Sequence, residues 1–192
     1  MKIKILKSIA CVLIAILLAT VGVLGLSIGL RSYRAAVQLD DITVDRGTAV
    51  YLASVYKMTY DGENFDEDFK AYLSDLVADA YLYSIHHGYT FIDKDIVDKT
   101  ANGVLNESAG GNVREFNEVA KEHGYGFTYT DFRNATALKH KAEEGRRLMP
   151  EFLGEEGYAN AKAEALGRIN FTDRYSNIDF SSIPDGHEYY VK

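Results

Sequence analysis

The chain is poor in cysteine and proline and has no tryptophan. Cys11 is the only cysteine among 192 residues, so no disulfide can form within the chain. Cys11 also lies near the start of an apolar run, whereas the lipidated cysteine of a bacterial lipoprotein follows such a run. The only prolines are Pro150 and Pro184. Long helices can therefore form between Arg34 and Met149, because proline is the residue that most often breaks a helix.

Acidic residues are absent from the first 30 positions. Residues 1–7 carry three lysines, and residues 8–30 are uncharged and dominated by Leu, Ile, Val and Ala. As a helix at about 1.5 Å per residue, this stretch is roughly 34 Å long, enough to cross a hydrocarbon core of about 30 Å. It exceeds the apolar part of a cleaved signal peptide, usually about 7–15 residues. We therefore predict an uncleaved transmembrane signal anchor over 8–30, with a cleaved signal as the alternative.

The lysines set the expected orientation. Positively charged flanks stay in the cytoplasm, so residues 1–7 are predicted to be a cytoplasmic tail, although Arg31 and Arg34 follow the span. The chain is then a single-pass protein of the cell membrane, in contact with the lipid bilayer through residues 8–30, and its C-terminal domain is extracytoplasmic. An outside domain without a disulfide favours a bacterial setting over a eukaryotic secreted one.

The rest of the chain is acidic. All 28 acidic residues but only 18 of the 21 basic ones lie beyond Leu30, which gives residues 31–192 a formal net charge of −10. This balance disfavours nucleic acid as a partner, because phosphate binding needs a basic face. The length of this part is sufficient for one domain with its own core.

Apolar spacing and capping residues predict a mainly α fold, in which the transmembrane helix is followed by a multi-helix domain and an irregular C-terminal tail. Residues 31–43 are expected to be a juxtamembrane linker, or an edge segment over Ala35–Ile42. A helical domain over 44–150 and a C-terminal helix and tail over 151–192 follow. The expected helices run from Asp45 to about Tyr60, from Asn64 or Asp66 to Gly88, from Asp93 to Gly110-Gly111, over Val113–His123, from Asp131 to about Leu148, and from about Leu153 onward. Pro150 is expected to help end the fifth of these helices. The tail that follows the last helix is irregular or contains one short strand.

A helical hairpin is predicted between Gly110 and Phe132. Gly110-Gly111 breaks the chain, Asn112 is a good N-cap, and Glu115 can complete a capping box. No Gly-Lys-Ser/Thr follows the two glycines, so they indicate a corner between helices and not a phosphate-binding loop.

Motifs for catalysis or metal binding are absent from the sequence. The five histidines form no HExxH motif and pair with no cysteine, and GxSxG does not occur. We therefore predict no metal site, no cofactor and no catalytic residues. The acidic pairs, such as Asp40-Asp41 and Glu155-Glu156, are typical of helix caps and solvated faces.

Aromatic residues are abundant, with 14 Tyr and 9 Phe. Most are expected in the core, but Tyr81 and Tyr83 lie on different faces of one predicted helix and cannot both point inward. Exposed Tyr and Phe are enriched where proteins bind other chains. We therefore assign polypeptide binding to Tyr51, Tyr56, Tyr72, Tyr81, Tyr83, Phe116 and Phe132.

The order of these segments resembles that of SurA-type periplasmic chaperones and PrsA-type foldases. The resemblance covers about residues 36–149 and rests on "AVQLDDITVDRGTAVYLASVYK" and on Gly110-Gly111, Phe116, Gly124 and Asp131-Phe132-Arg133. It implies a SurA-N-like helical domain. Only 43 residues follow Met149, too few for a parvulin isomerase domain. The resemblance therefore implies polypeptide binding without prolyl isomerisation.

Three functions remain open from the sequence. The first is a membrane-anchored, extracytoplasmic chaperone-like protein that binds unfolded or translocating polypeptides. The second is a non-catalytic helical subunit that docks a fixed partner in a bacterial membrane assembly. The third, an enzyme, is the least favoured. An exposed aromatic groove would support the first function, a flat apolar patch the second, and a cleft of acids or histidines with shifted pKa values the third.

Overall fold

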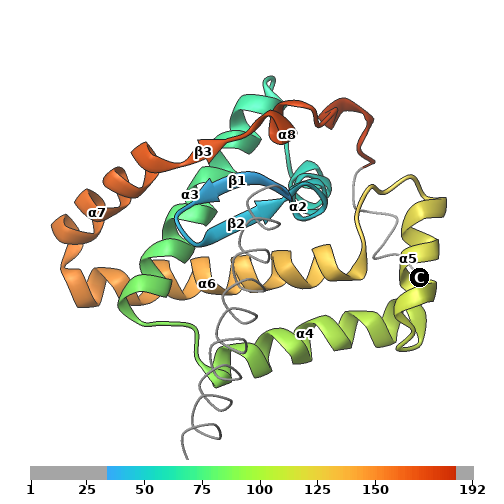
Figure 1. Ribbon diagram of the computed structural model, residues 1–192, viewed down its shortest axis with the longest axis horizontal. Helices are drawn as coiled ribbons and strands as arrows, with labels where there is room; N and C mark the ends of the chain where they lie inside the picture. Colours follow the sequence, from blue (N-terminus) through green and yellow to red (C-terminus); the bar gives the residue numbers. More distant parts are fainter. Residues whose placement is uncertain (1–33, 185–192) are drawn as a thin grey trace, which may run out of the picture. The chain divides into compact units, whose positions relative to one another are not determined.

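The computed structural model describes residues 34–184 and is mainly helical, as predicted, with one small antiparallel sheet (Figure 1). The elements are β1 (Ala35–Leu39), β2 (Ile42–Asp45), α2 (Arg46–Lys57), α3 (Phe65–His86), α4 (Phe91–Ala109), α5 (Val113–Glu122), α6 (Tyr129–Leu153), α7 (Glu155–Arg168), β3 (Asn170–Phe171), α8 (Asp173–Ser176) and the 3-10 helix η1 (Phe180–Ser182). A separate structural unit begins at Ala35. Within residues 34–184, no helix has the length and apolar character needed to cross a membrane. The anchor predicted over 8–30 lies outside the described residues.

A β-hairpin occupies most of the segment expected to be a linker. β1 pairs with β2 on one side and with β3 on the other, so it is the middle strand of the sheet and not an edge. Ala36, Val37 and Leu39 are each at most 1% exposed, so successive side chains are buried, as in a strand covered on both faces. Asp40 forms the turn with a φ of 48°, a left-handed conformation that Asp tolerates. The linker prediction was wrong here because so short an apolar strand has no visible period.

The helices α3 and α6 pack along each other and form the centre of the fold. Most of the apolar positions predicted for α3 are buried, among them Phe69 and Leu73. Gly145 of α6 lies against the backbone of Asp79 of α3, where an added Cβ atom would be 2.3 Å from the Asp79 carbonyl oxygen. Glycine at this position therefore allows the two helices to approach closely.

Capping boxes start α4 and α6 earlier than predicted. Thr90 caps α4 and Thr128 caps α6. Three residues further on, Asp93 and Asp131 accept hydrogen bonds from the cap amides at 2.6 and 2.7 Å. The sequence predicts helix starts at these aspartates, whereas each aspartate completes a capping box that a threonine opens.

The corner predicted between α4 and α5 is confirmed. Gly110 and Gly111 have φ values of 55° and 83°, which glycine adopts without steric cost. Asn112 caps α5, since its side chain accepts hydrogen bonds from the amides of Arg114 and Glu115.

Pro150 does not end α6 as predicted but lies inside it, and the helix continues to Leu153. A proline removes one backbone hydrogen bond and crowds the preceding turn, but here only the last residues of the helix follow it. The helix ends before Gly154, which has a φ of 74°, and α7 then forms as predicted.

The C-terminal segment packs into the same core as the helices. β3 joins the sheet, and Tyr175, Ile178 and Phe180 are buried. The Nζ atom of Lys57 donates hydrogen bonds to the carbonyl oxygens of Phe180 and Ile183 at 2.6 and 2.7 Å. Residues 177–184, where the sequence allowed either irregular structure or one short strand, contain η1 and no strand, and β3 precedes them. No boundary separates residues 151–184 from the helical domain.

Candidate functional site

The seven aromatic residues assigned to polypeptide binding do not form one surface. Four of them are buried, since Tyr81, Tyr83, Phe116 and Phe132 are 9%, 1%, 1% and 4% exposed. Tyr51, Tyr56 and Tyr72 are half-buried. Most of the set therefore stabilises the core in this conformation.

The structure separates these aromatic residues into groups. Tyr56 stacks on Tyr72 with ring centroids 4.8 Å apart. Tyr51 lies edge-on to Phe132 at 5.2 Å, and Phe116 is 5.9 Å from Phe132. Tyr51 and Phe132 both line one cavity on the surface of the domain.

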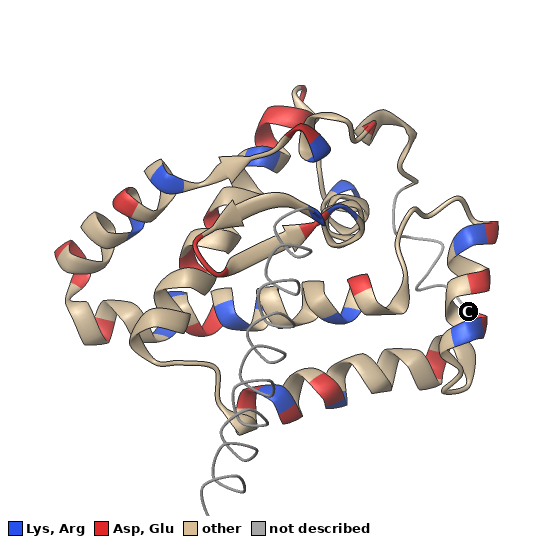
Figure 2. Cartoon of the chain, in the orientation of Figure 1, with Lys and Arg blue, Asp and Glu red and all other residues tan. Residues whose placement is uncertain are grey.

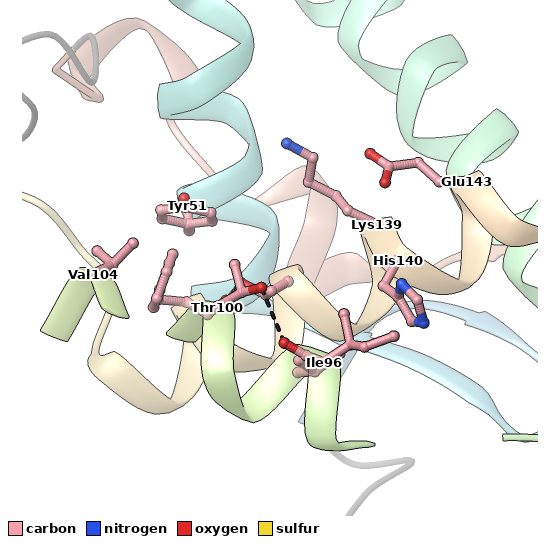
Figure 3. Close-up of a pocket in the computed structure, with 10 residues that line it drawn as sticks. Tyr51, Ile96, Thr100, Val104, Lys139, His140 and Glu143 are labelled. Carbon is pink, nitrogen blue, oxygen red and sulfur yellow. Dashed lines mark hydrogen bonds between the residues drawn. The ribbon is translucent and has the colours of Figure 1, made fainter. Parts of the chain in front are cut away.

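This cavity is a groove between α4 and α6, closed at one end by Tyr51 of α2 (Figure 3). Its volume is about 300 Å³. We refer to it as the α4–α6 groove, and its lining consists of Tyr51, Ile96, Val97, Thr100, Val104, Phe132, Thr136, Lys139, His140 and Glu143.

Helical spacing produces the two walls of the groove. On α4, Ile96, Thr100 and Val104 recur every fourth residue and therefore share one face. On α6, the spacing of Thr136, Lys139, His140 and Glu143 gives a more polar face in the same way. An apolar wall with a few polar groups opposite it is the usual composition of a protein binding site.

A polar network lies at the His140 end of the groove. The Oδ1 atom of Asp93 is 2.9 Å from His140 Nε2 and accepts a hydrogen bond from the Tyr83 hydroxyl at 2.9 Å. The Oδ2 atom accepts hydrogen bonds from the amide and the hydroxyl of Thr90 at 2.6 and 2.7 Å. Asp93 is only 5% exposed, so these four contacts replace the water that an exposed carboxylate would bind.

The network shifts the ionisation of its members. Burial opposes the charged form of Asp93, but the hydrogen bonds from Thr90, His140 and Tyr83 outweigh it and hold the pKa of this carboxyl well below its usual range. Burial and the hydrogen bond to Asp93 raise the pKa of Tyr83. Both groups are therefore fixed in their ordinary charge states near neutral pH.

A second buried carboxylate joins three helices away from the groove. Asp79 of α3 is fully buried, and it accepts hydrogen bonds from Arg146 Nε and from the Tyr158 hydroxyl, both at 2.7 Å. Lys162 Nζ lies 3.2 Å from the same carboxylate. Burial lowers the pKa of Arg146, and the hydrogen bond to Asp79 more than reverses this effect. The partners of Asp79 come from α6 and α7, so this carboxylate connects α3 to both helices.

Exposed apolar side chains, which the sequence analysis did not identify, gather elsewhere on the surface. Phe91 and Ile92 at the start of α4 are 83% and 70% exposed, and Phe152 at the end of α6 is 66% exposed. A sequence signal existed: Phe91 and Ile92 are out of phase with the buried positions Val97 and Ala101 of the same helix. Together with Ile85 and Tyr89, these three residues are called the apolar edge below.

Within residues 34–184, no three His, Cys, Asp or Glu side chains are placed to hold a metal ion. The His86 and His87 side chains line a second cavity of about 310 Å³ with Leu148, Met149, Glu151 and Phe152. The histidine ring of His86 contacts the Phe152 ring, with centroids 5.6 Å apart.

Comparison with known protein families, with curated proteins and with solved structures finds no match to this chain. The proposals below therefore depend on the geometry of the domain and on the sequence.

Proposed function

We propose that this chain is a non-catalytic, chaperone-like protein of the extracytoplasmic membrane surface, anchored by residues 8–30. In this proposal the α4–α6 groove receives apolar side chains of an unfolded or translocating polypeptide. The supporting observation is the groove itself: an open depression with a largely apolar wall on α4 and a polar wall on α6, built from two well-capped helices.

The size of the groove supports weak and broad binding. Its volume of about 300 Å³ is at the lower end of the range of about 300–1,000 Å³ for ligand sites. A volume of this size can take one or two apolar side chains. The polar side chains Thr100, Thr136 and Lys139 on its rim can form hydrogen bonds with a backbone of any sequence.

The state of the buried carboxylate beside the groove, Asp93, argues against its use as a general base. A general base needs a free lone pair and a pKa near the working pH. Asp93 has neither, since its two oxygens make four polar contacts and its pKa is lowered. We therefore propose that Asp93 holds the groove in shape and is not itself a general base.

One observation favours the second function, a helical subunit that docks a fixed partner in a bacterial membrane assembly. The apolar edge presents large exposed side chains at one corner of the domain, and exposed apolar patches commonly mark interaction surfaces. A fixed partner would bind with one stoichiometry, whereas a chaperone would bind unrelated unfolded chains.

Aggregation of an unfolded client protein tests the proposal. The full chain in lipid nanodiscs, in several-fold excess, should slow the aggregation of two unrelated reduced proteins. Ile96→Ser, which removes an apolar wall residue that is 44% exposed, should weaken this effect. Leu166→Ser on α7, at 37% exposed, is the matched control and should not.

Unchanged aggregation of both clients in the presence of the wild-type chain would contradict the chaperone-like function. Recovery of one stoichiometric protein from membranes, with no effect on the clients, would support the fixed-partner function instead.

A further inference from the structure

The apolar edge collects five of the eight large apolar side chains that are exposed within residues 34–184. Phe91, Ile92, Phe152, Ile85 and Tyr89 are 83%, 70%, 66%, 51% and 40% exposed. They lie at the end of α3, in the following turn, at the start of α4 and at the end of α6, at the lower left of Figure 1. This distribution places the largest exposed apolar side chains at one margin of the domain.

The corner that carries Phe91 and Ile92 is firmly held. Thr90 and Asp93 form the capping box at this helix start, and Asp93 is bound in turn by Tyr83 and His140. The Nζ atom of Lys141 lies 4.6 Å from the centre of the Tyr89 ring, a cation–π contact. Phe91 and Ile92 therefore project from a fixed backbone as the first two residues of α4.

The charges on the first turns of α4 are locally balanced, although the domain as a whole is acidic and Glu151 lies beside Phe152. On α4, Asp95 pairs with Lys99 at 2.8 Å, and Asp98 accepts a hydrogen bond from Arg133 Nε at 2.8 Å. Lys94 precedes both pairs on the same helix and adds a further positive charge. Figure 2 shows both signs of charge along the first turns of α4. A surface of this kind can approach anionic headgroups without the repulsion that the net charge would suggest.

We propose that the apolar edge inserts into the headgroup region of the lipid bilayer, with Phe91 and Ile92 as its deepest side chains. The short connection between the predicted membrane span and the domain makes lipid the expected partner of the apolar edge. The predicted span ends at Leu30, and four residues, at no more than about 3.6 Å each, separate it from Ala35. The domain is therefore confined to the membrane surface, where a few apolar side chains suffice for contact because the effective concentration of lipid is high.

Aromatic and aliphatic side chains at a helix start suit this interfacial position. Phe and Tyr rings favour the boundary between headgroups and acyl chains. Ile96, one turn beyond Ile92 on α4, lines the α4–α6 groove, so insertion of the edge would place the groove beside the bilayer. The inference depends on the membrane anchor of the proposed function, but not on polypeptide binding by the groove.

The absence of tryptophan from the chain makes the test direct, because a single introduced tryptophan supplies the only indole signal. Phe91→Trp reports on the edge. Val113→Trp is the matched control, since Val113 is also the first residue of a helix and is 42% exposed. Each full chain is reconstituted in vesicles of phosphatidylcholine and phosphatidylglycerol in equal amounts, with or without bromine on the acyl chains.

The indole of the Phe91→Trp variant should emit at shorter wavelength than that of the Val113→Trp variant, and the brominated lipid should quench it several-fold more strongly. Equal, water-like emission from both variants in vesicles that retain the chain would overturn the inference. The apolar edge would then be assigned to contact with a protein partner. Loss of the chain from the vesicles in an alkaline carbonate wash would contradict the anchor, and the membrane contact with it. The aggregation of client proteins is measured with the same two variants. This measurement separates a missing membrane contact or a missing anchor from a loss of polypeptide binding by the α4–α6 groove.

Discussion

His140 Nε2 lies 2.9 Å from Asp93 Oδ1, which joins the middle of α6 to the first turn of α4. Both walls of the α4–α6 groove belong to these helices, and no other described ion pair except Arg133–Asp98 crosses between them. The same carboxylate closes the capping box of α4 and binds the buried Tyr83 hydroxyl. Among the described residues, Asp93 is therefore one of two carboxylates that connect the walls of the groove.

Asp93→Asn should destabilise the domain, because the amide keeps the shape of the carboxylate but cannot accept all four contacts. Hydrogen bonds to charged groups contribute roughly 1.5–3 kcal/mol, and we expect a loss of about 2 kcal/mol in the free energy of unfolding measured with denaturant at pH 7. Asp95→Asn is the control. It removes an exposed pair with Lys99 and should change stability by less than about 0.5 kcal/mol.

The dependence of stability on pH follows from the direction of the Asp93 shift. Its pKa in the folded domain is lowered, so its stabilising effect is complete above the ordinary value of about 3.9 and is lost as the pH falls below that value toward the folded pKa. The wild-type chain should therefore lose more stability between about pH 5 and pH 3 than Asp93→Asn does. Equal losses in the two proteins would show that Asp93 is not a source of acid sensitivity.

Gly145→Ala should separate α3 from α6. The new Cβ atom would lie 2.3 Å from the Asp79 carbonyl oxygen, and overpacking of this kind costs about 1–3 kcal/mol. Gly103→Ala on α4 is the opposite control, because nothing lies within 4 Å of its Cβ position. It should stabilise the domain by about 0.5–1 kcal/mol through the better helix propensity of alanine. Melting temperatures that move in the same direction would contradict the close α3–α6 contact.

Gly110→Val should weaken the α4–α5 corner. Gly110 has a φ of 55°, and a residue with a Cβ atom pays about 1–2 kcal/mol to adopt a left-handed conformation. Gly110→Asn should recover most of this loss, since asparagine tolerates that conformation. Thermal unfolding of the three chains measures the effect, and a valine variant as stable as the wild type would rule out the corner geometry.

Polypeptide binding should depend little on salt. Apolar contacts in the groove are expected to supply most of the affinity, and raising the salt concentration from about 0.15 M to about 1 M shortens the Debye length from about 8 Å to about 3 Å. We expect the affinity for an unfolded client to change by less than about threefold over this range. A loss of an order of magnitude or more would assign the binding to charged side chains instead.

The helices could be predicted from the sequence because their signals are local. Asp45 accepts a hydrogen bond from the Thr48 amide and caps α2 as expected, and Asn112 does the same for α5. The middle position of β1 in a three-stranded sheet could not be predicted, because its second partner, β3, lies more than 130 residues further along the chain.

The candidate site was harder to predict than the helices. Periodicity shows that Tyr81 and Tyr83 belong to one helix, but not that α6 and α7 and the sheet cover both of its faces. These aromatic residues are consequently buried, whereas the groove is lined by Ile96, Val104 and Thr136, ordinary residues whose proximity arises only from the packing of α4 on α6.

Site-specific crosslinking tests the central claim, that the α4–α6 groove binds unfolded polypeptide, most directly. Cys11→Ser removes the only cysteine, and Thr100→Cys then carries a benzophenone label on an exposed position of the groove wall. Leu166→Cys in the same background is the control outside the groove. The groove label should capture two unrelated unfolded proteins and neither of their folded forms, with the control label capturing far less. Equal capture from both positions, or none from Thr100→Cys, would contradict the proposed function.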